Sequence, residues 1–511
     1  MLNSVRPISI GLVGHHPAWK LLLDQIGISW TVIELIHSDM AAQHSVVIVP
    51  QSTAENEERL LQEYASSGGA VLYTYSHPLT SKKAAAKKYT TSLPPHHTPE
   101  YAYSDIFDIY GTVYLFEDGK FIRTEQIGDG IISYCGIDIS SMVVDQRAIR
   151  KNFYAPTRRL PHELVSVISK NAIRQILQTH LEFLHHKRSL PFVHKWFFPN
   201  GENTLFTFRI DSDKGSKEQI DEIFHLGRRH DIPISWFLDV KSHEQWLDHF
   251  QNFDRQEIGI HCYEHATYNN LLLNKENFEK ARTLLMKQNI PTTGMTVPTG
   301  AWNNAIGGAI RDLGFIYSSE FCYDYDNFPS FPVVDSALSP VLQLPVHPVC
   351  IGIMIREKMS IEEMVEYYKT IIDRKLLFRE PICFYHHPTH KHNEVFEQVF
   401  QYMNAKKILK YTYREYAQWW KRRCQCSYSV SYDGVSLQLN FSQPSEVMLR
   451  ISIPDSGEVI IAPTEIVRLD SLPFTAEEPP HVPPSDIMRA RRFTRRHILQ
   501  NALDWWIKST E

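Results

Sequence analysis

The chain has 511 residues, of which 43% are hydrophobic and 22% charged, a composition that supports several buried cores and more than one domain. Its formal net charge of −5 gives no global reason to expect nucleic acid as a partner. The arginines between 489 and 496 are interpreted as the solvated face of a terminal helix. The seven cysteines fit reduced thiols, the start lacks a basic and apolar leader, and no run of about eighteen apolar residues occurs. These features predict a soluble cytoplasmic protein without a transmembrane segment.

Residues 1–150 alternate strand-like and helix-like runs. Strands are expected at 8–13, 31–36, 45–49 and 70–75, helices at 18–26 and 54–66, and two hairpin-like runs at 112–116 and 121–124. This order predicts a doubly wound α/β domain. The pattern VVIVPQS…YASSGGAVLYTY resembles the glutamine-amidotransferase-like fold. Enzymes of that fold carry a cysteine after such a strand, whereas this chain has Tyr73-Thr74-Tyr75-Ser76-His77, so we expect binding or regulation rather than glutaminase activity.

The rest of the chain divides into four further segments. Apolar residues at helical spacing from Glu163 to His186 predict a helical linker over 151–190, and a second α/β region is expected over 191–423. Short alternating strands with an Asp433-Gly434 hairpin turn predict a small β unit over 424–470, packed beside that region. Residues 471–511 are expected to form a Pro/Glu-rich connector and a terminal helix ending in Trp505-Trp506.

Two polar clusters follow strand-like runs in the second α/β region. Asp211 and Asp213 end the run that starts near Thr204, and His261 and His265 follow the run Glu257–Ile260. Such pairs also occur by chance on helices and in turns. Here both fall at the carboxyl ends of strands, where α/β barrels hold their active sites. Two imidazoles and one carboxylate can bind a divalent ion and leave one position open for water, so the pattern predicts a catalytic metal site.

Residues from about 200 to 420 resemble the polysaccharide deacetylase (NodB-homology) family. The resemblance rests on four stretches in the family's order, which are FRIDSD at 208–213, EIGIHCYEH at 257–265, GMTVPTGAWNNAI at 294–306 and ICFYHHPTH at 382–390. It implies a distorted α/β barrel that holds one divalent metal ion through one Asp and two His. Zinc is the expected metal, with cobalt, nickel, manganese or iron as alternatives.

The resemblance also implies roles for individual residues. Asp213, His261 and His265 would bind the metal, and Asp211 would act as the base, although Ser212 separates two aspartates that are adjacent in the family. This insertion leaves the assignment of base and ligand between the two aspartates open. His387 would be the general acid, with His386 as the alternative.

The third stretch departs from the family at one position. Pro298, Thr299, Gly300 and Trp302 would line the substrate groove. The family's Arg two residues before the proline is replaced by Thr296, and we expect Arg209 to orient the base in its place.

The resulting hypothesis is a metal-dependent hydrolase that deacetylates an amino sugar in an oligosaccharide, a polysaccharide or a precursor. Hydrolysis of a non-sugar amide is the second enzymatic reading, because metal-activated water is indifferent to what bears the carbonyl. A non-catalytic glycan- or metabolite-binding protein is the alternative from another class. The sequence does not determine the oligomeric state.

Overall fold

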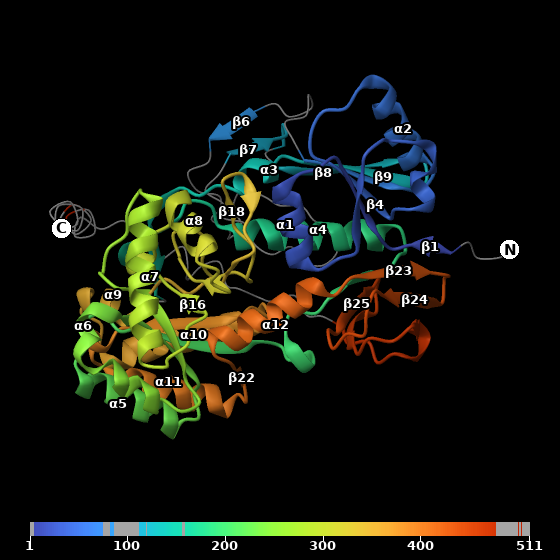
Figure 1. The fold of residues 1–511 in the computed structure, drawn as a ribbon. Helices are drawn as coiled ribbons and strands as arrows, with labels where there is room; N and C mark the ends of the chain where they lie inside the picture. Colours follow the sequence, from blue (N-terminus) through green and yellow to red (C-terminus); the bar gives the residue numbers. More distant parts are fainter. Residues whose placement is uncertain are drawn as a thin grey trace. The chain divides into compact units, whose positions relative to one another are not determined.

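The computed structural model describes residues 5–74, 82–85, 112–118, 120–155 and 159–476, together with 499 and 502 (Figure 1). Ser76-His77, the arginine-rich run and Trp505-Trp506 lie outside the described residues. The chain forms two compact units. The first comprises Met1–Asp145, Ile168–Glu202 and Trp419–Pro480, and the second comprises Gln146–Val167, Asn203–Gln418 and His481–Glu511. Both units are therefore assembled from separate stretches of sequence, unlike the contiguous domains expected from the sequence pattern.

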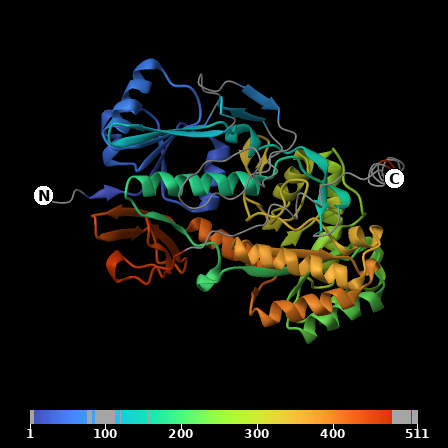
Figure 2. The ribbon, with the colours of Figure 1, turned by 180° about the vertical axis from the view of Figure 1, so that it is seen from behind.

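The first unit contains a six-stranded sheet in the order β3-β2-β4-β5-β9-β8, in which only β8 is antiparallel. Helix α2 packs on one face through the cluster of Val47, Val49, Leu61 and Val71. On the other face α4 approaches β9, where His180 Nε2 lies 2.7 Å from Ser133 Oγ (Figure 2). This is the doubly wound arrangement that the sequence predicts. The elements are β2 (Ile10–Val13), α1 (Pro17–Ile26), β3 (Trp30–Ile33), β4 (Val46–Val49), α2 (Glu55–Ser66), β5 (Ala70–Tyr73), β8 (Ile122–Ile127), β9 (Gly130–Cys135), α3 (Ile139–Met142) and α4 (Lys170–Lys187). The resemblance of this region to glutamine amidotransferases stays a prediction.

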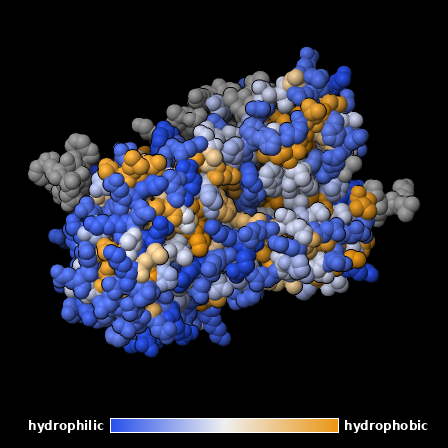
Figure 3. All heavy atoms as spheres, in the orientation of Figure 1, coloured by the Kyte–Doolittle hydropathy of each residue, from blue (hydrophilic) through white to orange (hydrophobic). Residues whose placement is uncertain are grey.

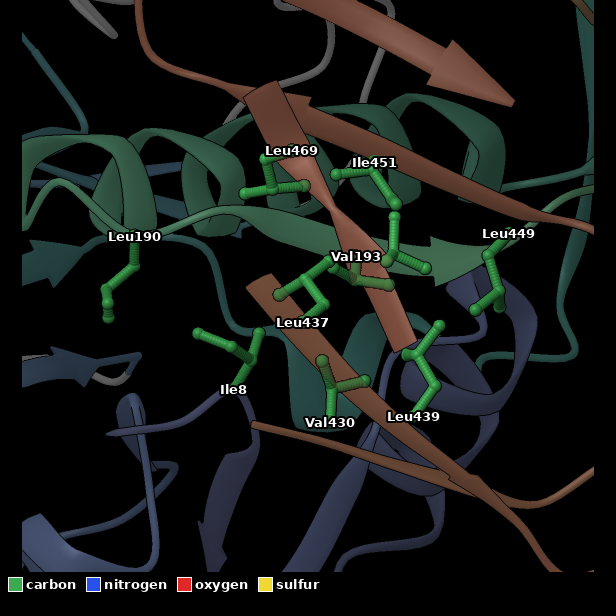
Figure 4. Packing of buried hydrophobic residues seen from close by; sticks show 10 residues of the cluster. Ile8, Leu190, Val193, Val430, Leu437, Leu439, Leu449, Ile451 and Leu469 are labelled. Carbon is green, nitrogen blue, oxygen red and sulfur yellow. The ribbon is translucent and has the colours of Figure 1, made fainter. Parts of the chain in front are cut away.

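The C-terminal strands complete their sheets with strands from far upstream. β1 (Arg6–Pro7) pairs with β23 (Tyr428–Tyr432), and β12 (Phe192–Lys195) pairs with β25 (Leu449–Ile453). The remaining strands are β24 (Ser436–Phe441), β26 (Gly457–Ile461) and β27 (Ile466–Arg468). Apolar residues from all these segments meet in one cluster (Figure 4). The partners of this β unit are thus β1 and β12.

Two details differ from the expected linker and hairpins. Residues 148–166 form an antiparallel pair, β10 (Ala148–Tyr154) and β11 (Arg159–Ser166), so that the helix expected from Glu163 begins at Lys170. β7 (Thr112–Leu115) pairs with β6 (Lys82–Ala85), while β8 pairs with β9. In both places the structure depends on pairing with other strands, which the local periodicity of the sequence does not show.

The second unit is a curled parallel β-sheet in the order β20-β17-β16-β15-β14-β13-β21, with β22 pairing β13. Beyond β20, His347 N–H donates to the Cys383 carbonyl in β21 over 2.9 Å, which links the first and last strands of this order. The strands are β13 (Leu205–Asp211), β14 (Ile234–Asp239), β15 (Glu257–Cys262), β16 (Gly294–Met295), β17 (Tyr317–Ser318), β20 (Leu342–Gln343), β21 (Ile382–His386) and β22 (Leu409–Lys410). This arrangement confirms the predicted α/β fold class with a barrel-like sheet.

Helices connect these parallel strands, and α12 follows β22, the last of them in the chain. They are α5 (Lys217–Arg229), α6 (Val240–His243), α7 (Leu271–Lys287), α8 (Asn304–Asp312), α9 (Ile351–Arg356), α10 (Ile361–Leu377), α11 (Asn393–Ala405) and α12 (Tyr413–Gln425), and a short pair, β18 (Val333–Val334) with β19 (Ala337–Leu338), precedes β20. Hydrophilic residues predominate on the outer face around α5 and α11 (Figure 3). Their buried faces carry Ile223 and Phe400, as expected for amphipathic helices that cover a sheet. Among the described residues, no helix combines the length and apolar character that crossing a bilayer requires.

Candidate metal centre

Both aspartates of the first motif reach the same end of the sheet. Strand β13 ends at Asp211, and a tight turn follows, in which Gly215 N–H donates to the Ser212 carbonyl over 2.7 Å. The side chain of the intervening Ser212 has partners outside the site. Its Oγ accepts from Asp239 N–H at 2.9 Å and lies 2.8 Å from His243 Nε2. The inserted serine therefore leaves Asp211 and Asp213 free to face the site.

Asp213 meets both histidines of the second motif. Its Oδ1 lies 3.2 Å from His261 Nε2 and 3.2 Å from His265 Nε2, and a set of one ligand atom from each residue fits within 4.8 Å. Asp213 Oδ1 is inaccessible to solvent and makes no hydrogen bond of good geometry. Burial raises the pKa of Asp213. The neighbouring imidazoles, His261 foremost, lower that pKa by a larger amount, so the pKa of Asp213 lies well below its usual range. An ionised carboxylate and two imidazole nitrogens that converge in this way fit a divalent cation.

The site is open on one side. His261 is buried, whereas the side chains of His265 and Asp213 remain 32% and 25% exposed. A water molecule or a substrate can therefore approach the side chains of His265 and Asp213 from solvent, although Asp213 Oδ1 itself is covered. This combination is typical of catalytic sites, because a structural zinc site is closed by four protein ligands.

The backbone at the end of β15 is irregular where it presents His261. The register with β14 pairs Leu238 with Ile260 and Asp239 with Cys262, so His261 forms a bulge. Cys262 adopts a φ of 124°, a left-handed conformation that is costly for a residue with a side chain. Bulges and strained residues of this kind redirect side chains beside functional sites.

Asn277 of α7 holds the loop that carries His265. Its Oδ1 accepts from Tyr263 N–H at 3.1 Å and from Glu264 N–H at 2.7 Å. Its Nδ2 donates to the carbonyls of Glu264 and Ala266 at 2.9 and 3.0 Å. This amide therefore satisfies four backbone groups of a loop that has no regular structure. The sequence motif gave no signal for this role.

A second layer of polar groups connects the candidate metal ligands with Asp211. Thr296 Oγ1 lies 2.7 Å from His261 Nδ1 and 3.5 Å from Asp211 Oδ1. Arg209 Nη2 donates to Asp211 Oδ2 at 2.9 Å. If His261 Nδ1 donates to Thr296, His261 Nε2 keeps its lone pair toward Asp213, which is the tautomer that a ligand needs.

Arg209, which the sequence predicts to orient Asp211, is fully buried. Its Nη1 donates to the carbonyl and the Oγ of Ser319, at 2.7 and 2.8 Å, and its guanidinium lies 5.1 Å from the Tyr385 ring centre. Burial lowers the pKa of Arg209, but the Asp211 carboxylate together with Tyr413, Tyr385 and Glu320 raises it by more, so the guanidinium remains charged. A cation thus contacts Asp211 on the side away from Thr296.

The two candidate acids occupy different environments. His387 Nε2 lies 3.5 Å from Asp213 Oδ2, and its side chain is 16% exposed. His386 is completely buried, its ring centre is 5.0 Å from that of Phe396, and burial lowers its pKa well below the usual range. Only His387 of the two contacts the ligand cluster.

The residues of the third motif also lie in two different environments. Pro298–Gly300 forms a 3₁₀ turn directly after Thr296, with φ of 59° at Thr299 and 58° at Gly300. A Cβ at Gly300 would approach Phe321 to 2.5 Å, so glycine is required there. Trp302 is 8% exposed, donates from Nε1 to Gln146 at 3.1 Å and packs on Tyr323. Its described contacts are with the protein core.

No family model matches the sequence, and no curated protein does either. Solved structures are similar to part of the chain. A probable polysaccharide deacetylase from Pseudomonas aeruginosa PAO1 is 15% identical, with a TM-score of 0.38, over 44% of this chain and 93% of that one. The Puue allantoinase is 13% identical, with a TM-score of 0.38, over 44% and 92%. A CE4 family pseudoenzyme from Bacillus anthracis is 13% identical, with a TM-score of 0.31, over 53% and 89%. Likenesses this loose establish neither a shared family nor a shared reaction for this chain.

Proposed function

We propose that this protein is a metal-dependent hydrolase that removes the acetyl group from an N-acetylated amino sugar of an oligosaccharide, a polysaccharide or a precursor of one. The convergence of Asp213, His261 and His265 at a solvent-accessible strand end is the observation that carries the proposal. The Arg209–Asp211 pair and His387 lie around the same three residues. Metal-dependent amide hydrolysis requires ligands for the metal ion, a carboxylate base and an acid.

Asp213, His261 and His265 would hold the ion, with zinc as the expected metal for one carboxylate and two imidazoles. When bound, a divalent ion polarises the acyl carbonyl and lowers the pKa of a nearby water from about 16 toward about 7. Asp211 accepts the proton that this water loses as it attacks the acyl carbon. Arg209 donates to one carboxylate oxygen and Thr296 approaches the other, which fixes the plane of the Asp211 base.

His387 completes the proton transfers. The carbon–nitrogen bond breaks after attack, and the departing nitrogen needs a proton to leave as a neutral amine. His387 supplies that proton from its imidazolium form, because its Nε2 lies beside Asp213 and its side chain reaches the surface of the site. The products are acetate and the free amino sugar, and the proton taken up by Asp211 restores His387.

Acetate release from N-acetylated chito-oligosaccharides tests the proposal. We expect release that a chelator abolishes, that added Zn²⁺ or Co²⁺ restores, and that Asp213→Asn lacks. Asp221→Asn is the matched control, because this carboxylate contacts His249, outside the ligand cluster. Bound metal without acetate release would contradict the amino-sugar substrate and favour another amide. If the protein binds neither Zn²⁺ nor Co²⁺, the proposal of a metal-dependent hydrolase is wrong, and a non-catalytic binding protein is favoured.

A further inference from the structure

A second cluster of metal-binding side chains lies next to the first. Cys350, His387 and His390 each offer one ligand atom, and these atoms lie within 4.8 Å of one another. Cys350 directly precedes α9, and the two histidines belong to the loop that follows β21. Cys350 is buried and the two histidines are half-buried, so the cluster lies just beneath the surface.

One nitrogen of each histidine in this cluster has no other described use. The Nδ1 atoms of His387 and His390 are inaccessible to solvent and have no hydrogen-bond partner of good geometry. His387 Nε2 is the atom that approaches Asp213, so its Nδ1 is the nitrogen left for the second cluster. Both Nδ1 atoms are therefore available to a cation held by this cluster.

The packing around His390 is specific. A Cβ at Gly352 would lie 2.5 Å from Cε1 and 2.7 Å from Nε2 of His390, so only glycine at position 352 admits the imidazole in this place. The α9 segment therefore supplies both the Cys350 thiol and the space for His390.

The three side chains form a set that soft and borderline cations prefer. Thiolate and imidazole suit zinc, whereas the first cluster contributes one oxygen and two nitrogens. Zinc bonds of about 2.3 Å to sulfur and about 2.1 Å to nitrogen place tetrahedral ligand atoms roughly 3.3–3.7 Å apart, within the 4.8 Å limit that contains these three atoms.

We infer that Cys350, His387 and His390 form a second metal site, which binds a zinc-like divalent cation and shares His387 with the catalytic groups. Coordination through Nδ1 keeps the His387 imidazole neutral, and a neutral imidazole cannot deliver the proton that an imidazolium delivers. Excess zinc therefore inhibits the enzyme, a consequence that rests on the proposed function. The existence of the site does not.

Titration of the metal-free full-length protein with Co²⁺ tests the site without any assay of activity. We expect a near-ultraviolet charge-transfer band from a cobalt–thiolate bond in the wild type. The band should persist in His261→Ala and in the control Cys424→Ser, and it should disappear in Cys350→Ser and weaken in His390→Gln. A wild type that shows no such band at saturation, or a band that survives in Cys350→Ser, would overturn the second site.

Inhibition by zinc tests the consequence separately. In each protein, acetate release with excess Zn²⁺ is divided by release with stoichiometric Zn²⁺. We expect this ratio to be at least about tenfold lower in the wild type than in Cys350→Ser, since losing a general acid costs about 100-fold. Equal ratios would overturn the inhibitory role. Absence of acetate in every protein would instead contradict the proposed hydrolase, while the cobalt band would still report on the second site.

Discussion

Thr296 stands where the family that this region resembles carries an arginine two residues before the proline, and its hydroxyl lies between a candidate metal ligand and the candidate base. It is 2.7 Å from His261 Nδ1 and 3.5 Å from Asp211 Oδ1. The fully buried Arg209 contacts the same Asp211 from the other side. At the residue scale, the electrostatic task of one side chain is thus divided between two, and each can be varied by itself.

We expect Thr296→Val to weaken zinc binding by about 10- to 100-fold, because a metal-binding histidine without its outer partner loses orientation and basicity. Competition with a chromogenic chelator measures the affinity. Thr293→Val is the matched control, since the Thr293 hydroxyl has no hydrogen-bond partner of good geometry. Equal affinity in the two variants would show that Thr296 does not position His261.

The adjacent histidines His386 and His387 provide a second comparison. We expect His387→Gln to lower kcat for deacetylation by about 100-fold or more while Zn²⁺ remains bound, as the loss of a general acid does. His386→Phe should retain activity within about threefold, because the buried His386 imidazole packs on Phe396 and an aromatic ring of similar size replaces it. Steady-state kinetics of the two variants, with the zinc content of each measured in parallel, distinguish the roles of the two histidines. The opposite ranking would make His386 the acid.

At the scale of elements, the site depends on α7 as much as on the strands. The side chain of Asn277 makes four hydrogen bonds to the loop of residues 263–266, which follows β15 and carries His265. The loop has no regular structure, so α7 substitutes for the backbone hydrogen bonds that a helix or a strand would provide. The position of His265, a candidate metal ligand, is therefore set by the neighbouring helix.

We expect Asn277→Ala to destabilise the protein by about 1–3 kcal/mol and also to weaken metal binding, because four backbone groups of the loop lose their partner and His265 loses its support. Asn270→Ala in the same helix removes an N-cap, in which Asn270 Oδ1 accepts from Leu273 N–H at 3.1 Å. That change should cost about 1 kcal/mol of stability and leave zinc affinity intact. Urea unfolding and zinc competition of both variants separate the two effects. Undiminished zinc affinity in Asn277→Ala would exclude the support of His265.

The sequence could predict elements whose determinants are local. The alternation of strands and helices in the first unit, the Asp433-Gly434 hairpin and the α/β class of the barrel follow from periodicity and turn chemistry. The sequence could also identify candidate metal ligands, because strand ends and residue types that bind metals can both be recognised from it. These candidates are Asp213, His261 and His265. Their roles as ligands remain predictions.

Features that depend on distant pairing were not predictable. No local pattern shows that β1 and β12 complete the C-terminal sheets, that β10 and β11 pair within the expected helical linker, or that His347 joins the Cys383 strand. The clamp by Asn277 is of the same kind, because an asparagine within an ordinary amphipathic helix carries no signature. Side-chain to backbone contacts across a fold become visible only in three dimensions.

At the scale of the whole molecule, stability should depend on pH through buried histidines of the first unit. Burial lowers the pKa of His180, His185 and His194 to about 3, and all three are buried. His180 and His185 contact Ser133 and Ser45, respectively, at 2.7 and 2.8 Å. The folded unit therefore keeps these imidazoles neutral in conditions where an unfolded chain would protonate them.

The direction of the pH effect follows from the two pKa values of each histidine. In the unfolded chain the pKa is about 6.5, so between pH 6.5 and pH 3 the unfolded state binds more protons. Stability is complete above pH 6.5 and falls by about 1.4 kcal/mol per pH unit for each such histidine as the pH decreases.

Hydrogen exchange of the α4 peptides at pH 7 and pH 5.5, corrected for intrinsic exchange, measures this loss. We expect a smaller loss in His180→Gln, which keeps a polar group near Ser133 but does not titrate. An identical loss of protection in the wild type and in His180→Gln would rule out a contribution from this histidine.

The central claim is that Asp213, His261 and His265 bind one catalytic divalent ion. Elemental analysis of the purified wild type and His261→Ala, each equilibrated with Zn²⁺ and assayed for acetate release, tests this claim most directly. The wild type should hold about one equivalent more zinc than the variant, and only the wild type should release acetate. Equal zinc contents, or acetate release that survives in His261→Ala, would contradict the claim.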